Sequence, residues 1–368
     1  MSRYQPHAEA NRSSEVGIRA GDQSLTVFVN PYNGAITGVL NDDQRIMDKI
    51  EKLHGELMAG TLGDRLVELA ACWAIILLIT RIFLWWPRER KGGVFGTFLP
   101  RLNGGKRIFW RDLHAVPAFW LSLGIAFLIL TGLPWSGFWG DQFQKLATDA
   151  GIGYPAAVWG GEKPESTIPS KDVADVPWAA EQRPVPQSKD ERVSPISIDK
   201  VVAIADARHV HPGYNVYYPE GPKGVYTVSV FPDKSKDEAT LFLDQYSGKV
   251  LDDYRFADYG PIAKIIATGI TLHKGTEFGL PNQIAGLIIC LGIVGISITG
   301  LVMWWKRKPS NKLGTPPLPK NFKLVKGVGV LVIALGILFP LVGLSLVIVW
   351  LLDWLIIKRI PMVKQWVG

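Results

Sequence analysis

Three of the six histidines in this sequence, His54, His114 and His273, lie next to long apolar segments. A neutral imidazole at the end of a membrane helix can serve as an axial ligand of haem iron, and helix bundles commonly hold such cofactors. Two imidazoles at one depth on different helices would form a bis-histidine site for haem b. His54 and His273 are therefore candidate haem ligands, and His114 is a further candidate. The alternative is that each ring is hydrated by water or lipid headgroups, as a lone interfacial histidine usually is.

The remaining residues with reactive side chains indicate little further chemistry. His7 lies near the start of the sequence, and His209 and His211 have no nearby carboxylate or cysteine to complete a metal site, so loop positions are expected for them. The two cysteines, Cys72 and Cys290, lie in apolar segments, which argues against a disulfide framework or a thiolate metal site. The sequence contains no phosphate-binding loop, nucleophile elbow, zinc-protease motif or dinucleotide fingerprint.

Four apolar segments of this 368-residue chain are long enough to span a bilayer. Three contain uncharged runs longer than the ~20 residues that a span requires. The fourth has Glu68 and Arg81 near its two ends, where a long side chain can reach the interface. The predicted spans are residues 64–86, 112–138, 280–305 and 327–353. Because Pro340 interrupts the last of these, a re-entrant or interfacial element is the alternative there.

Lysine and arginine are concentrated in two loops, residues 87–111 and 306–326, and this sets the expected orientation. By the positive-inside rule both loops are cytoplasmic. They also account for the excess of Lys and Arg over Asp and Glu, 40 against 33, better than nucleic-acid binding does. The loops follow the tryptophan pairs Trp85-Trp86 and Trp304-Trp305, which suit the headgroup layer. The segments 1–63, 139–279 and 354–368 are then expected outside the cytoplasm.

The chain repeats itself, which predicts two halves with one plan. At one offset, Leu53-His54 aligns with Leu272-His273, and at another the turn Asn33-Gly34 aligns with Ser247-Gly248. Each half is expected to hold a β-hairpin, an amphipathic helix and an inward span. The second half also predicts a helix at 193–207, strands at 224–230 and 241–250, and a linker at 151–189. The repeat predicts a membrane helix ahead of residues 1–63. Because the sequence does not contain this helix, we expect residues 1–63 to form a truncated module, a hairpin followed by the amphipathic helix.

Taken together, these motifs resemble the PepSY-associated transmembrane family of bacterial iron-regulated membrane proteins. The resemblance covers nearly the whole chain. It rests on Lys52-Leu53-His54 with Trp85-Trp86-Pro87-Arg88, on Arg111-Asp112-Leu113-His114 with Leu130-Thr131-Gly132, and on Thr271-Leu272-His273-Lys274-Gly275 with Trp304-Trp305-Lys306-Arg307.

The resemblance implies a bacterial inner-membrane protein: an α-helical transmembrane bundle with periplasmic α+β PepSY-like modules. Family members studied as siderophore reductases carry b-type haems and reduce ferric siderophores in the periplasm, releasing Fe(II). By position, His54 and His273 would serve a haem on the periplasmic side. His114 would serve one on the cytoplasmic side, whose other ligand lies on the family's first helix. Because this sequence lacks that helix, we expect one haem here, and two in a chain that has it.

The favoured function is a transmembrane electron conduit. Electrons from a cytoplasmic or quinone donor would pass through haem and reduce a ferric siderophore at the outer face. Reduction would labilise the complex, because hard oxygen ligands that suit Fe(III) hold Fe(II) less tightly. One alternative is a non-enzymatic PepSY membrane protein that binds or regulates a periplasmic protein. Another is an accessory of a metal or siderophore transporter, since the spans lack the paired buried acids of an autonomous transporter.

Overall fold

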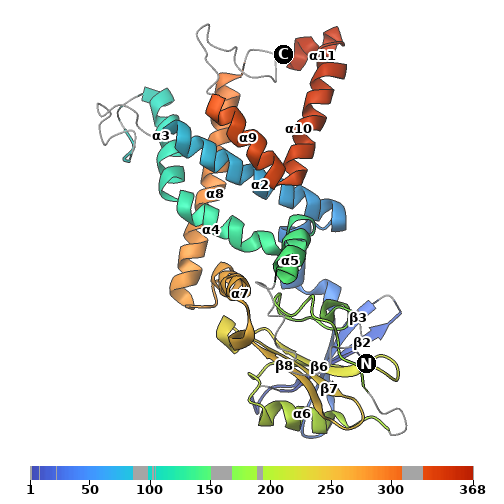
Figure 1. Ribbon diagram of the computed structural model, residues 1–368. Coiled ribbons are helices and arrows are strands. Elements are labelled where there is room, and N and C mark those ends of the chain that lie inside the picture. The colour runs from blue at the N-terminus through green and yellow to red at the C-terminus, as the bar shows by residue number, and fades with distance from the viewer. Residues whose placement is uncertain are drawn as a thin grey trace. The chain divides into compact units, whose positions relative to one another are not determined.

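The structure is a computed structural model with two compact units (Figure 1). The sheet unit comprises Met1–Met58 and Gly140–Asn282, and the helical unit comprises Ala59–Trp139 and Gln283–Gly368. The described residues are 2–7, 9–21, 23–85, 98–101, 103, 105–150, 168–188, 194–308 and 326–367. The predicted basic loop 306–326 therefore lies largely outside the described residues, and so does about half of loop 87–111.

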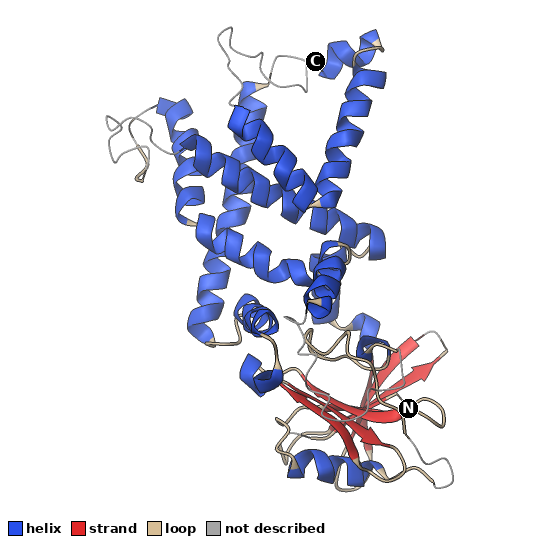
Figure 2. Cartoon of the chain, viewed as in Figure 1, coloured by secondary structure: helices blue, strands red, loops and turns tan. Residues whose placement is uncertain are grey.

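The sheet unit is built on one antiparallel sheet of eight strands in the order β4-β3-β2-β1-β5-β6-β7-β8, drawn in red in Figure 2. The strands are β1 (Arg3–Gln5), β2 (Ser14–Ala20), β3 (Gln23–Val29), β4 (Ile36–Asn41), β5 (Asn215–Tyr217), β6 (Val225–Val230), β7 (Ala239–Asp244) and β8 (Val250–Arg255). Each half of the chain contributes a meander of four strands. The two meanders join where β1 pairs with β5, with Tyr4 opposite Val216.

The structure repeats with the register that the sequence predicts. The turns at Asn33-Gly34 and Ser247-Gly248 connect β3 to β4 and β7 to β8, and both glycines have positive φ, 70° and 75°. The register shift lies at Phe28/Val29 in one hairpin and at the equivalent Phe242/Leu243 in the other. The first module is larger than expected, since β1 and β2 extend the hairpin to four strands. β1 has only three residues and shows no apolar alternation in the sequence, whereas in the seven-residue β2 the apolar Val16, Ile18 and Ala20 do alternate with other residues.

Helices cover both faces of the second meander. On one face α6 (Ile198–Ala207) buries Val201 against Val228 and Leu241, all fully buried. On the other face α5 (Trp139–Asp149) and α7 (Pro261–Lys274) pack with Tyr254 of β8. Residues 168–188, predicted as part of a linker, belong to this second core, where Trp178 is 6% exposed. The proline-rich composition of this segment produces irregular backbone, but its scattered apolar residues are buried.

The helical unit contains three helices long and apolar enough to cross a membrane, or four if one bent pair counts as a single span, among the residues that the structure describes. Its helices are α2 (Gly60–Trp85), α3 (Gly105–Trp120), α4 (Ser122–Gly132), α8 (Leu280–Arg307), α9 (Lys326–Leu338), α10 (Pro340–Leu352) and α11 (Pro361–Val367). The chain is thus a membrane protein with three or four spans, and the third single helix that qualifies, Pro340–Ile357, begins and ends later than the predicted span 327–353.

Two of the expected spans differ from single straight helices. The predicted span 112–138 consists of α3 and α4, which meet at an angle of 58° around Leu121. Pro117 lies one turn earlier and lacks the N–H that would bond to the Leu113 carbonyl, which favours a bend. The predicted span 327–353 is broken at Phe339, and Pro340 begins α10. By itself α9 is ~20 Å long, shorter than the ~30 Å hydrocarbon core.

Candidate functional site

His54 and His273 lie together in the sheet unit. His54 is on α1 (Ile46–Glu56) and His273 is near the end of α7. Their ring centroids are 6.3 Å apart, and the ring planes are inclined by 58°. His54 is exposed and His273 is half-buried. The structure therefore brings together two imidazoles that lie more than 200 residues apart in the sequence but occupy equivalent repeat positions.

The end of α7 that carries His273 is held by a network of hydrogen bonds. The Glu277 carboxylate accepts from the Thr271 hydroxyl at 2.6 Å and from the Ser235 backbone N–H at 3.0 Å. Gly275 ends the helix with φ 81°, a left-handed conformation that favours glycine. The Asn282 side-chain amide donates to the Leu272 carbonyl at 2.9 Å. These contacts fix the backbone on both sides of His273.

The helix that carries His54 is held more loosely. No residue of α1 is buried, and Ile46, Ile50 and Leu53 form an exposed apolar face. An amphipathic helix with such a face is typical of helices that lie in a membrane interface. Lys52 ties α1 to the preceding 3₁₀ turn through a 3.0 Å ion pair with Asp43. His54 therefore has more freedom to adjust to a ligand than His273.

The spacing of the two rings fits ligation of one metal ion. With metal–imidazole bonds of about 2 Å and ring centres roughly 1 Å beyond the nitrogens, two imidazoles on opposite sides of an ion have centres about 6 Å apart. Within the described part of the chain, no group of three or more His, Cys, Asp or Glu side chains could hold a bare ion. Haem supplies its own four equatorial nitrogens and needs only axial ligands. The donor set of His54 and His273 thus fits haem better than a bare ion.

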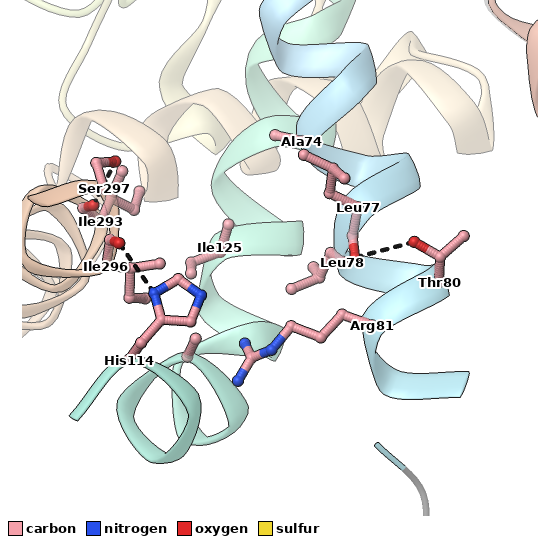
Figure 3. A pocket seen from close by; sticks show the side chains of 11 residues that line it. Ala74, Leu77, Leu78, Thr80, Arg81, His114, Ile125, Ile293, Ile296 and Ser297 are labelled. Carbon is pink, nitrogen blue, oxygen red and sulfur yellow. Dashed lines mark hydrogen bonds between the residues drawn. The ribbon is translucent and has the colours of Figure 1, made fainter. Parts of the chain in front are cut away.

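His114 lies in the helical unit, on α3, and lines a cavity of about 600 Å³ (Figure 3). Its Nδ1 is 3.1 Å from both the Ile296 carbonyl oxygen and the Thr299 hydroxyl oxygen. A carbonyl oxygen can only accept, so Nδ1 carries the hydrogen and donates. In the neutral ring Nε2 is then an acceptor. This unit contains no other histidine, so it cannot supply a second imidazole from its own residues.

Arg81 lines the same cavity, which sequence reasoning did not anticipate. An arginine near the end of a span is expected to extend to the interface. Instead the guanidinium turns into the helical unit and donates to the Ala115 carbonyl. Figure 3 shows it beside His114. The one sequence signal for this position was a charged residue inside an otherwise apolar segment, which marks functional sites in membrane proteins.

Of the other three histidines, His7 is half-buried, with its ring centroid 6.0 Å from that of Tyr32, and the remaining two are exposed. His209 and His211 are in the loop between α6 and β5, as predicted, and both are exposed. His209 has φ 54° just after the end of α6. The Nδ1 atom of His211 is 2.8 Å from the Pro212 carbonyl oxygen, a local contact. Neither joins a group of potential metal ligands in the part of the chain that is described.

The apolar helices and the antiparallel sheet together define a multi-pass membrane protein that carries a sheet unit outside its spans. The model of the PepSY-associated TM region matches residues 2–307, and the chain belongs to this family. The suspected family is therefore confirmed. No curated protein shows significant similarity to the chain.

Proposed function

We propose that this protein is a haem-containing reductase of the bacterial inner membrane that reduces ferric siderophores in the periplasm. The observation that carries the proposal is the 6.3 Å separation of the His54 and His273 rings. The two rings come from different helices of one compact unit. Family membership supports the same assignment, because the residues that resemble the family's motifs include both histidines.

His54 and His273 would hold haem b, which would supply a one-electron carrier. Each imidazole would bind the iron through a deprotonated ring nitrogen. His273 provides the rigid side of the site, through the bonds that fix the end of α7. His54 provides the adjustable side, since α1 has no buried residue.

The order of elements along the chain supports a periplasmic position for the sheet unit. Both α2 and α8 begin directly after segments of the sheet unit, and both end at the strongly basic loops 87–111 and 306–326. If those loops are cytoplasmic, the sheet unit lies on the other side of the membrane. The exposed apolar face of α1 suits the outer membrane–water boundary.

The proposed reaction transfers one electron to a ferric chelate, giving the ferrous chelate. Hydroxamate and catecholate oxygens are hard ligands, so they hold Fe(II) less tightly than Fe(III) and release it after reduction. The substrate class rests on the family resemblance. The electron would come from a cytoplasmic or quinone donor.

The test is an absorption spectrum of the detergent-purified full chain, oxidised and dithionite-reduced, with haem quantified as pyridine haemochrome. We expect a b-type spectrum with about one haem per chain. The variants H54A and H273A should lose it, whereas H209A and H211A should retain it, because the latter histidines are exposed loop residues. An unchanged spectrum in both H54A and H273A would refute the ligand assignment.

The reductase step is tested separately, with the pre-reduced protein and a ferric hydroxamate under anaerobic conditions. Reoxidation of the haem should accompany formation of Fe(II), measured as its ferrozine complex. A folded protein that contains no haem after expression with ample haem supply would instead support the non-enzymatic alternative, a PepSY membrane protein that binds a periplasmic partner.

A further inference from the structure

The helices α9 and α10 fold back on each other. Gly336 of α9 and Gly343 of α10 are in contact, since a Cβ added to Gly343 would lie 2.6 Å from the Gly336 carbonyl oxygen. In one straight helix these two residues would be about 10 Å apart along the axis. Figure 1 shows the two helices, at the red end of the colour bar, as a V that is closed where they meet. The chain therefore reverses its direction between α9 and α10.

The tip of this hairpin is buried within the helical unit. Phe339 is 4% exposed and Val342 is fully buried, and both lie in one core with Cys72, in the middle of α2. The Trp73 indole N–H donates to the Ser345 hydroxyl at 3.1 Å, which ties α10 to the same part of α2. The middle of a spanning helix lies near the middle of the bilayer, and α9, ~20 Å long, is too short to cross it. The tip thus ends inside the membrane.

The hairpin determines on which side of the membrane the chain continues. Pro340–Ile357 is long and apolar enough to cross a membrane, but because it runs back beside α9 it ends on the side where α9 began. That side holds the basic loop 306–326. Residues 354–365, here called the basic tail, contain three basic residues and no acidic one, so the positive-inside rule places them there as well. A single span at 327–353 would instead place this tail outside the cytoplasm.

The end of α10 and the basic tail expose aromatic side chains. Trp350 and Trp354 are 62% and 47% exposed, and their rings stack with centroids 6.2 Å apart. The Arg359 guanidinium lies over the Trp354 ring, 5.1 Å from its centroid. Exposed tryptophans beside basic side chains are typical of the headgroup layer of a membrane.

The basic side chains of the tail are also exposed. The Lys358 ammonium lies 2.7 Å from the Asp353 carboxylate, and the Lys358 side chain is 63% exposed. Arg359 and Lys364 are exposed as well. Three cations against one carboxylate leave residues 353–365 with a net charge of +2, the sign that an anionic lipid surface attracts.

We propose that α9 and α10 form a re-entrant hairpin and that the basic tail binds the anionic phospholipid head groups of the cytoplasmic leaflet. Trp354 lies at the level of the head groups, and the three cations of the tail contact their phosphate oxygens. This contact holds the open end of the hairpin at the membrane surface. The proposal does not depend on the haem site, because the hairpin lies outside residues 2–307, which match the family model.

The hairpin is tested by labelling single cysteines with a membrane-impermeant maleimide in spheroplasts that express the full chain. Cys72→Ala and Cys290→Ala first remove both native cysteines. Gln365→Cys then reports on the tail, Ser310→Cys on the loop 306–326 and Ser24→Cys on the sheet unit. We expect Gln365→Cys and Ser310→Cys to be labelled only after permeabilisation, and Ser24→Cys to be labelled in intact spheroplasts.

The two marker positions make this test independent of the assumed orientation. Opposite labelling of Ser24→Cys and Ser310→Cys shows that the chain is inserted and defines the two sides of the membrane. If Gln365→Cys is labelled under the same conditions as Ser24→Cys, the tail has crossed the membrane and the hairpin is refuted.

Lipid binding is tested on the purified full chain in nanodiscs, with the environment-sensitive dye acrylodan attached to Gln365→Cys. We expect the emission to shift to the blue when phosphatidylglycerol replaces part of the phosphatidylcholine. Each cation near an anionic surface favours the bound state about fivefold, so changing all three tail cations to Gln should abolish the shift. Salt at about 1 M, where the Debye length is about 3 Å, should reverse it.

The matched control changes three exposed lysines of the sheet unit, Lys223, Lys234 and Lys236, to Gln and should retain the shift. Equal emission with and without phosphatidylglycerol would overturn the proposed lipid contact. A shift of unchanged size in the variant without tail cations would overturn it too, because the dye would then respond to the lipid without help from the basic side chains.

Discussion

Glu238 gives the sheet unit a predictable dependence on pH. This residue lies between β7 and the preceding 3₁₀ turn, and it is 6% exposed. Burial raises its pKa from 4.5 to about 7, although the hydrogen bond from the Tyr259 hydroxyl, 3.0 Å long, and the charge of Lys274 both lower the pKa. Glu277 is a nearby like charge that raises it.

The size and sign of the effect follow from this shift. Between pH 4.5 and about 7 the folded state binds more protons at Glu238 than the unfolded state does. Stability therefore falls as the pH rises through this window. The full difference between the two pKa values, 4.5 and about 7, corresponds to about 3 kcal/mol in the free energy of unfolding. For a unit of about 200 residues this is a change in Tm of ~6–12 °C.

The perturbation is Glu238→Gln, which keeps the size of the side chain and an acceptor for Tyr259 but removes the titration. Thermal unfolding of the full chain in detergent is followed by tryptophan fluorescence, whose signal includes that of Trp178 in the core of this unit. At pH 4.5 the two proteins should melt together. At pH 8 the variant should melt ~6–12 °C higher than the wild type. Parallel profiles within about 2 °C over this range would refute the reasoning.

Three further predictions concern packing. Leu241→Ala, at a fully buried position, should lower the free energy of unfolding by about 2–5 kcal/mol. Leu53→Ala, on the exposed face of α1, should lower it by less than about 0.5 kcal/mol. Both values are measured by denaturant titration. Gly343→Ala would place a Cβ 2.6 Å from a backbone oxygen of α9, so it should lower the Tm of the helical unit, while Gly329→Ala, with open space around it, should not. Arg183→Ala should destabilise the sheet unit by about 3–5 kcal/mol, because it leaves the buried carboxylate of its ion-pair partner, Asp252 on β8, without a counter-charge. An unchanged melting curve would contradict this prediction.

The sequence by itself determined the elements whose physical requirements are local. A membrane span requires a long apolar run with few charges, so α2 and α8 were visible directly. A tight turn requires a residue that tolerates positive φ, so Gly34 and Gly248 marked both hairpins. The repeat identified His54 and His273 as equivalent positions, because each lies the same number of residues before the end of its membrane span.

Only the tertiary structure decided which distant segments meet. The pairing of β1 with β5 joins two meanders into one sheet, and three-residue strands carry no periodicity that could predict it. The inward turn of Arg81 depends on the carbonyl of Ala115 on another helix. The burial of Glu238 depends on Tyr259. Hydrogen bonds and desolvation act between residues that are neighbours in space. A linear sequence therefore shows which side chains are present, but it does not show the contacts that give the cavity and the histidine pair their chemistry.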